Sequence, residues 1–120
     1  MVLVDTSVWV DHLRRGDAVL ASLLHAGEVL RHPFVVGELA CGGIRNRSRI
    51  LRLLQALPAV PKAQDDEVLL FIDRHRLAGA GLGLIDMHLL ASCLLAGAAL
   101  WTRDARLAGA AAKLGLASKP

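Results

Sequence analysis

The chain is 120 residues long, and 54% of those residues are hydrophobic. This length suits one domain spanning residues 1–120, because two smaller units would each lack a sufficient core. The hydrophobic fraction excludes a disordered chain, and the net charge of +3 is too small to indicate nucleic-acid binding by itself. With two Trp, two Phe and no Tyr, the chain lacks the aromatic residues of a base-stacking RNA platform.

Strands and helices alternate along the predicted chain. The apolar run over residues 2–4 predicts a buried strand, which leads into a helix that ends before Gly16. Asp17 can cap a second helix over 18–26, residues 28–31 form a second strand, and Pro33 begins a helix that ends at Cys41. The later elements are a helix over 44–57, a helix over 65–76, a glycine-rich loop over 78–83, a helix over 84–95, a strand over 98–102 and a helix over 105–113. This order predicts an α/β fold in which a parallel sheet lies under helices.

Several features of the sequence bear on the location of the protein. The N-terminus has no basic region and reaches Asp5 at once, so no secretory signal is expected. Cys41 and Cys93 lack a CxxC spacing, and we predict that both are small buried residues in a reducing compartment. Residues 82–101 are long enough to cross a bilayer. However, they include Asp86 and His88, so a buried helix that continues into a buried strand explains them better. We therefore expect a cytoplasmic protein without a membrane segment.

Four of the eleven acidic residues are not explained by local structure alone. Glu38 has no basic neighbour three or four positions away on its predicted helix, so it needs either a partner or a position near solvent. Asp5, Asp86 and Asp104 each precede or open a helix, and each could be an N-cap. Asp5 and Asp104 also follow predicted parallel strands, whose carboxyl ends commonly form ligand sites. The other acids are explained as caps, first-turn or loop residues, or ion-pair partners: Asp11, Asp17, Glu28, Asp65, Asp66, Glu67 and Asp73.

Four carboxylates that converge at one edge of a sheet would repel one another, and a divalent cation would relieve that repulsion. Oxygen ligands suit Mg²⁺ or Mn²⁺. Zinc is not expected, because no ligand spacing joins the five His residues. Without the four acids, the chain has 14 basic and seven acidic residues, a net charge of +7. An acidic metal site within basic surroundings suits a polyanionic substrate whose phosphate meets the metal.

The segments that contain these acids carry a family resemblance. They are Val-Leu-Val-Asp5-Thr6-Ser7-Val-Trp at the start, then Val36-Gly37-Glu38-Leu39, Ile85-Asp86-Met87-His88-Leu89-Leu90-Ala91 and Leu100-Trp101-Thr102-Arg103-Asp104. In these segments the chain resembles the PIN-domain ribonucleases, and among them the VapC toxins of bacterial type II toxin–antitoxin pairs. The resemblance extends from Met1 to about Leu116. Each motif is short, but four acids in this order and at this spacing are specific.

This resemblance implies a three-layer α/β/α PIN-like fold and a Mg²⁺- or Mn²⁺-dependent endoribonuclease that acts as a toxin. It implies that Asp5, Glu38, Asp86 and Asp104 are both the metal ligands and the catalytic residues. Hydroxyls beside this site are expected from Thr6 or Ser7 and from Thr102. Cleavage by a metal-activated water would leave a 5′-phosphate and a 3′-hydroxyl. The implied partners are the RNA substrate, a cognate VapB-type antitoxin and a second copy of the chain in a homodimer.

The predicted helix over 44–57 carries a basic segment. Arg45, Arg49 and Arg52 would lie on one face of that helix, which suits a solvated face, a contact with the RNA backbone or a docking edge for the antitoxin. Arg47 would fall on the apolar side, from which it could reach a carboxylate or a partner. The candidates for the surfaces that bind the antitoxin or a second copy are Leu13, Leu23, Leu24 and Leu53.

Two other classes of function are consistent with parts of the sequence. A phosphotransfer domain could use Asp5 as a nucleophile, but position 7 is Ser rather than a second Asp, and no Lys is placed as a receiver domain requires. A non-catalytic RNA- or partner-binding PIN-like module would use the same carboxylates only as helix caps. Such a module would not bind divalent ions, so metal binding separates it from the nuclease.

Overall fold

A three-stranded parallel sheet forms the centre of the computed structural model, which describes residues 1–118. The strands are β1 (Val2–Val4), β2 (Val29–Leu30) and β3 (Ala99–Trp101), in the spatial order β2-β1-β3. In the parallel register of β1 and β3, Val4 lies opposite Trp101. The pairing continues one residue further, because the Asp5 amide donates to the Trp101 carbonyl at 2.9 Å. Asp5 and Thr102 therefore emerge from the same edge of the sheet.

Single bridges extend the sheet on both sides of these three strands. Arg31 pairs in parallel with Ala59 beyond β2, and Leu100 pairs in parallel with Ala117 beyond β3. The sheet edges are thus partly covered by backbone from the segments around residues 59 and 117, which limits pairing with other chains.

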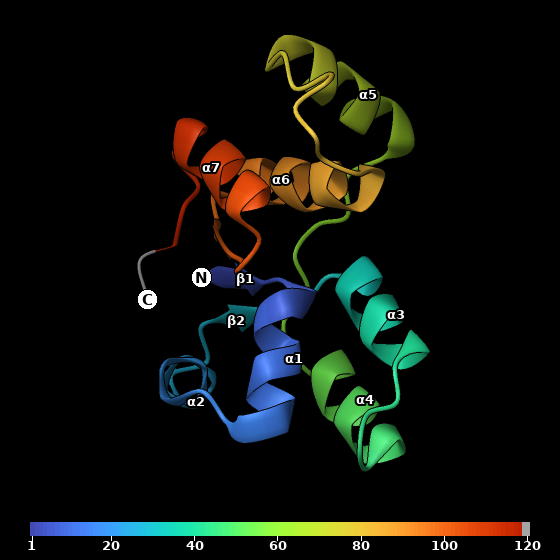
Figure 1. The fold of residues 1–120 in the computed structure, drawn as a ribbon, viewed down its shortest axis with the longest axis vertical. Coiled ribbons are helices and arrows are strands. Elements are labelled where there is room, and N and C mark those ends of the chain that lie inside the picture. Colours follow the sequence, from blue (N-terminus) through green and yellow to red (C-terminus); the bar gives the residue numbers. More distant parts are fainter. Residues whose placement is uncertain (119–120) are drawn as a thin grey trace.

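Helices cover both faces of the sheet (Figure 1). One side carries α1 (Thr6–Arg15), α2 (Ala18–His25), α3 (Pro33–Cys41) and α4 (Arg47–Gln55), and the other carries α5 (Asp65–Arg74), α6 (Leu84–Ala96) and α7 (Ala105–Lys113). The predicted three-layer α/β/α fold is confirmed. Helix α5 packs on α6 at the far end from the sheet.

Local sequence signals place most of the helix ends where we predicted them. The Asp17 side chain accepts a hydrogen bond from the Leu20 amide at 2.9 Å and so caps α2, and Gly16 before it has a φ of 75° that favours glycine. Helix α4 is shorter than predicted, because Asn46 adopts a left-handed conformation with φ of 53° and the helix begins only after it. Arg45 consequently lies outside the helix, and the predicted face of Arg45, Arg49 and Arg52 is wrong.

The core lies on β1, β3 and the middle of α6. Leu3 and Val4 have no exposed surface, and every residue of α6 from Met87 to Cys93 is buried. The apolar stretch over 82–101 folds as α6 followed by β3, as predicted. None of the helices within residues 1–118 has the length and hydropathy needed to span a bilayer.

Candidate active site

The carboxylates predicted to form the site come from four different elements. Asp5 follows β1, Asp104 immediately precedes α7 beyond β3, Asp86 lies in the first turn of α6, and Glu38 lies in α3. Burial raises the pKa of Asp86, and the negative charges of Asp5 and Asp104 raise it further. These three carboxylates are therefore electrostatic neighbours at one edge of the sheet.

Asp5 is the most buried of the four, with 8% of its surface exposed, and two hydroxyls hold it in place. The Thr102 hydroxyl donates to Asp5 Oδ2 at 2.7 Å, and the Ser7 hydroxyl donates to the same oxygen at 3.0 Å. Each hydroxyl in turn accepts a backbone N–H, Thr102 from Asp104 at 3.1 Å and Ser7 from Arg103 at 3.0 Å. A carboxylate oxygen can only accept, so the short contacts of both hydroxyls with Asp5 Oδ2 are donated by the hydroxyls. Asp5 lies at the N-cap position of α1 but makes no side-chain cap, so the cap alternative does not hold for it.

Glu38 lies on the exposed surface of α3, near solvent, which was one of the two explanations considered for it. It also has a partner, since the Thr6 hydroxyl donates to Glu38 Oε1 at 2.8 Å. Thr6 directly follows Asp5, so this hydrogen bond links α3 to the end of β1. The hydroxyls of Thr6, Ser7 and Thr102 all lie beside site carboxylates, as the family resemblance implied.

Asp104 is the N-cap of α7, as one alternative predicted, whereas Asp86 is not an N-cap: it is the third residue of α6 and bonds back to the N-cap residue, Gly83. Each of the two carboxylates uses one oxygen for this hydrogen bond. Asp86 Oδ2 accepts from the Gly83 amide at 3.2 Å, and Asp104 Oδ1 accepts from the Leu107 amide at 3.0 Å. A cap and a ligand role are compatible, because a carboxylate has two oxygens and about four lone-pair sites. The cap hydrogen bond fixes the orientation of the carboxylate and leaves the second oxygen available.

All four carboxylates share this arrangement. One oxygen of each accepts a hydrogen bond from the protein, while the other oxygen has no hydrogen-bond or ion-pair partner within residues 1–118. In the same part of the chain, no three His, Cys, Asp or Glu side chains lie close enough to bind one ion together. The site is thus an open set of carboxylates, each held separately by its own donor.

Arg103 is a structural residue of the site that our sequence analysis missed. Its Nε lies 2.7 Å from Asp11 Oδ2, and its Nη2 lies 2.7 Å from Asp17 Oδ2. Within residues 1–118, Asp11 also contacts one arginine of its own helix, Arg15, at the longer distance of 3.6 Å. The two short ion pairs attach the Thr102–Asp104 segment to α1 and to the turn before α2. The position of Arg103 between two predicted site residues was the only sequence signal for this role.

The arginines of the basic segment differ in their contacts. Arg47 does reach across, but its Nε and Nη2 donate to the Ala40 carbonyl at 3.2 and 2.9 Å rather than to a carboxylate. It therefore satisfies one of the last carbonyls of α3. Arg45 and Arg14 line a groove of about 350 Å³ that also includes Thr6 and Glu38. The groove leads from basic residues to one of the site carboxylates.

The histidines and cysteines lie outside this site. His32 is fully buried, its Nδ1 accepts from the Phe34 amide at 3.0 Å, and its Nε2 lies 3.3 Å from the Ser92 hydroxyl. Burial, together with the charges of His88 and Lys62, lowers the pKa of His32 to about 4. Cys93 is buried as predicted, and burial raises its pKa to about 12. Cys41 is exposed at the end of α3, so the prediction that it is buried is wrong.

Similar proteins identify the family of this chain. A family model described as the PIN domain matches residues 2–113. Two relatives from Mycobacterium tuberculosis, strains CDC 1551 / Oshkosh and ATCC 25618 / H37Rv, are each named Ribonuclease VapC32 and are 51% identical to this chain over 118 residues. The similarity covers 98% of this chain and 95% of each relative. The chain therefore belongs to the PIN-domain family, and within it to the VapC-type ribonuclease toxins.

Proposed function

We propose that this chain is an endoribonuclease that cleaves RNA phosphodiester bonds with the help of Mg²⁺ or Mn²⁺, and that it is the toxin of a toxin–antitoxin pair. The main support is the set of four carboxylates, each with one oxygen held by a protein donor and one without a partner in residues 1–118. Burial is the main cause of the raised pKa of Asp86, and the negative charges of Asp5 and Asp104 add to it, which supports a grouping of these three carboxylates.

In this proposal Asp5, Glu38, Asp86 and Asp104 hold the metal through their free oxygens. The donor set suits a small, hard divalent ion, which prefers carboxylate oxygens and keeps several waters. When bound, the ion lowers the pKa of a water molecule and stabilises negative charge on the departing oxygen. The charge of such an ion would also oppose the mutual repulsion of the carboxylates.

The protein residues have separate tasks in this mechanism. Thr102 and Ser7 orient Asp5, because both hydroxyls donate to the same Asp5 oxygen. Thr6 donates a hydrogen bond to Glu38 and so orients the second carboxylate. Arg14 and Arg45, which line the groove that includes Glu38, attract the RNA backbone and place a phosphate near that carboxylate.

Two protein partners belong to the same proposal. An apolar groove of about 160 Å³ between α1, α2 and α4 includes Leu24 and Leu53, and Leu13 connects it to the groove that contains Glu38. We assign this continuous surface to the antitoxin, since a segment lying there could reach the site. A homodimer is proposed as well, and we place the protein in the cytoplasm, where it would meet RNA.

The proposal is tested by titrating Mn²⁺ into the purified chain in a calorimeter while RNA cleavage is assayed in parallel. The wild type and the control Asp66→Asn, an exposed acid on α5 outside the site, should bind Mn²⁺ and cleave RNA. Asp5→Asn should fold normally but lose both properties. A folded wild-type chain that binds no divalent ion would instead favour the non-catalytic module.

A further inference from the structure

A basic hollow of about 280 Å³ lies between the chain that leads from α5 to α6 and the exposed side of α7. Its basic lining residues are Arg76, Arg106 and Lys113, together with His75, and none of the residues that line it within 1–118 is acidic. In that part of the chain, the two arginines and the lysine have no ion-pair partner. Because like charges repel, three unpaired bases around one concave surface indicate that it receives an anion.

Two of these bases lie on one face of α7. Arg106 and Lys113 are seven residues apart, which is about two helical turns and about 10 Å along the axis. Gly109 and Ala110 lie between them and also line the hollow. Since these two residues have little or no side chain, the space above this face of the helix stays open. The two bases can therefore contact a single extended polyanion at two points.

Packing against the loop, rather than an ion pair, positions the guanidinium of Arg106. A Cβ atom added to Gly81 would lie 2.8 Å from Arg106 Nη1 and 3.3 Å from its Cζ, so only glycine leaves room for the guanidinium there. Within residues 1–118, arginine side chains donate hydrogen bonds from other positions but not from 106. A guanidinium that is held in place while its donors stay free suits a phosphate, which it can bind through two parallel hydrogen bonds.

The hollow adjoins two of the site carboxylates. Asp104 is the N-cap of α7, and Arg106 follows it by two residues in the first turn of the same helix. On the other side of the hollow, the loop leads through Gly83 into the first turn of α6, which carries Asp86. The basic groove that includes Glu38 lies among α1 and α3, in the other helical layer. The carboxylates thus lie between two separate basic surfaces.

We propose that this hollow binds a backbone phosphate of the RNA substrate next to the scissile bond. Arg106 is the main contact, and Arg76 and Lys113 flank it. The inference rests on the proposed function, because it concerns how the strand is held while it is cleaved. A free phosphate ion has the same chemistry, but the position of the hollow beside Asp86 and Asp104 favours the RNA backbone. In this arrangement the strand crosses the carboxylates from one basic surface to the other.

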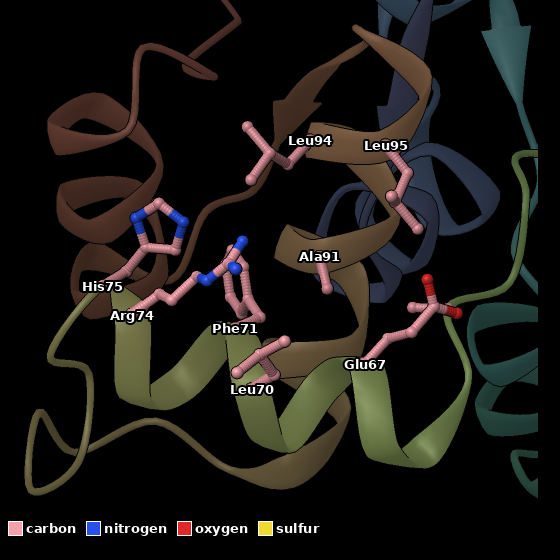
Figure 2. Close-up of a pocket in the computed structure, with 9 residues that line it drawn as sticks. Glu67, Leu70, Phe71, Arg74, His75, Ala91, Leu94 and Leu95 are labelled. Carbon is pink, nitrogen blue, oxygen red and sulfur yellow. The ribbon is translucent and has the colours of Figure 1, made fainter.

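The contact is tested by fluorescence anisotropy with a labelled single-stranded RNA, in EDTA and at several salt concentrations. Arg106→Gln should bind on the order of tenfold more weakly, and the slope of log affinity against log salt concentration should fall by about 0.7 for the lost phosphate contact. Arg74→Gln is the matched control, because Arg74 lines a different hollow, between α5 and α6 (Figure 2). It makes the same charge change and should leave affinity and salt slope near those of the wild type.

Two glycines of the loop give a second test that removes no charge. Gly79 and Gly81 have φ values of 75° and 80°, so alanine is strained at both positions. A Cβ atom at position 79 meets nothing within 4 Å, whereas one at position 81 meets Arg106. The two alanine variants should therefore lose similar amounts of Tm, but only Gly81→Ala should weaken RNA binding, about as much as Arg106→Gln does. Equal RNA affinities of the two alanine variants would overturn the proposed role of Arg106.

Cleavage kinetics separate this inference from the proposed function. Arg106→Gln should raise KM about tenfold and change kcat little, because the hollow binds the strand away from the reacting bond. If the wild type cleaves RNA and Arg106→Gln binds RNA with unchanged affinity and salt slope, the inference is wrong and the nuclease proposal stands. If the wild type binds RNA through Arg106 but cleaves none with Mn²⁺ present, the nuclease proposal is wrong and the phosphate site stands.

Inorganic phosphate distinguishes the two sources of the anion. It should compete with RNA for the wild type and compete less well for Arg106→Gln, because the same guanidinium binds both. Binding of inorganic phosphate that depends on Arg106, combined with an RNA affinity that does not, would assign the hollow to the free ion and overturn the proposal.

Discussion

The hydroxyl of Thr102 offers a direct test of how the site is held together. It donates to Asp5 Oδ2 at 2.7 Å and accepts the Asp104 amide at 3.1 Å, so it connects two of the proposed metal ligands. Thr102→Val keeps the shape of the side chain and removes the hydroxyl. Thr102→Ser is the matched control, because it keeps the hydroxyl and removes only a methyl group.

The size of the effect follows from the kind of hydrogen bond that is lost. A hydrogen bond to an ionised group contributes about 1.5–3 kcal/mol, and Asp5 is only 8% exposed, so water replaces the lost donor poorly. Ser7 still donates to the same Asp5 oxygen, and the amide of exposed Asp104 can bond to water. We therefore expect Thr102→Val to lower the free energy of unfolding by about 2 kcal/mol, which corresponds to roughly 6–10 °C in Tm for a chain of this length.

The assay is urea denaturation in EDTA, combined with RNA cleavage in Mn²⁺. Cleavage should fall about 10- to 100-fold, as it does when a residue that orients a metal ligand is removed. A double-mutant cycle with Asp5→Ala isolates the contact and should give a coupling energy of at least about 1.5 kcal/mol. A coupling energy near zero, or a Thr102→Val variant as stable and active as Thr102→Ser, would refute the idea that this hydroxyl orients Asp5.

Three further predictions concern charge. Burial and the charges of Asp5 and Asp104 raise the pKa of Asp86, which means that its ionised form is disfavoured in the fold. Asp86→Asn should therefore raise the Tm of the metal-free protein, and it should lower RNA cleavage on the order of a hundredfold or more. A lower Tm in EDTA would contradict this. Arg103→Ala removes two short ion pairs, so it should lower the free energy of unfolding by about 1–2 kcal/mol in urea denaturation and weaken Mn²⁺ binding about tenfold. Arg15→Ala loses only one contact of 3.6 Å and should change both quantities little. Because the pKa of His32 is about 4 in the fold against 6.5 normally, the unfolded chain binds more protons between these values, and up to roughly 3 kcal/mol of stability should be lost as pH falls from 6.5 to 4. Urea denaturation at several pH values should show that His32→Gln loses less stability than the wild type over this pH range, whereas the control His25→Gln, at an exposed position, should behave like the wild type. An equal pH dependence of stability in the wild type and both variants would argue against this role of His32.

Most of the secondary structure and the candidate acids could be predicted before the fold was known. Helix starts and ends depend on residues within about one turn, as at Asp17 and Pro33, so the local sequence is enough to place them. Asp5 and Asp104 each follow an apolar run that predicts a strand. Because the carboxyl ends of parallel strands lie at one edge of a sheet, the sequence alone predicted that these two acids lie at the same edge. Helix α4 was predicted too long because helical spacing does not reveal the left-handed turn at Asn46.

The support of the site could be seen only in the folded chain. Thr102 and Asp5 are 97 residues apart in the sequence, and Arg103 and Asp17 are 86 apart. Contacts at such separations depend on strand register and helix packing, which local patterns do not encode. Exposure depends on the same long-range packing, and so Cys41 proved exposed although its neighbours are apolar. The identities of the acids are local information, but the hydroxyls and the arginine that hold them become visible only after the chain has folded.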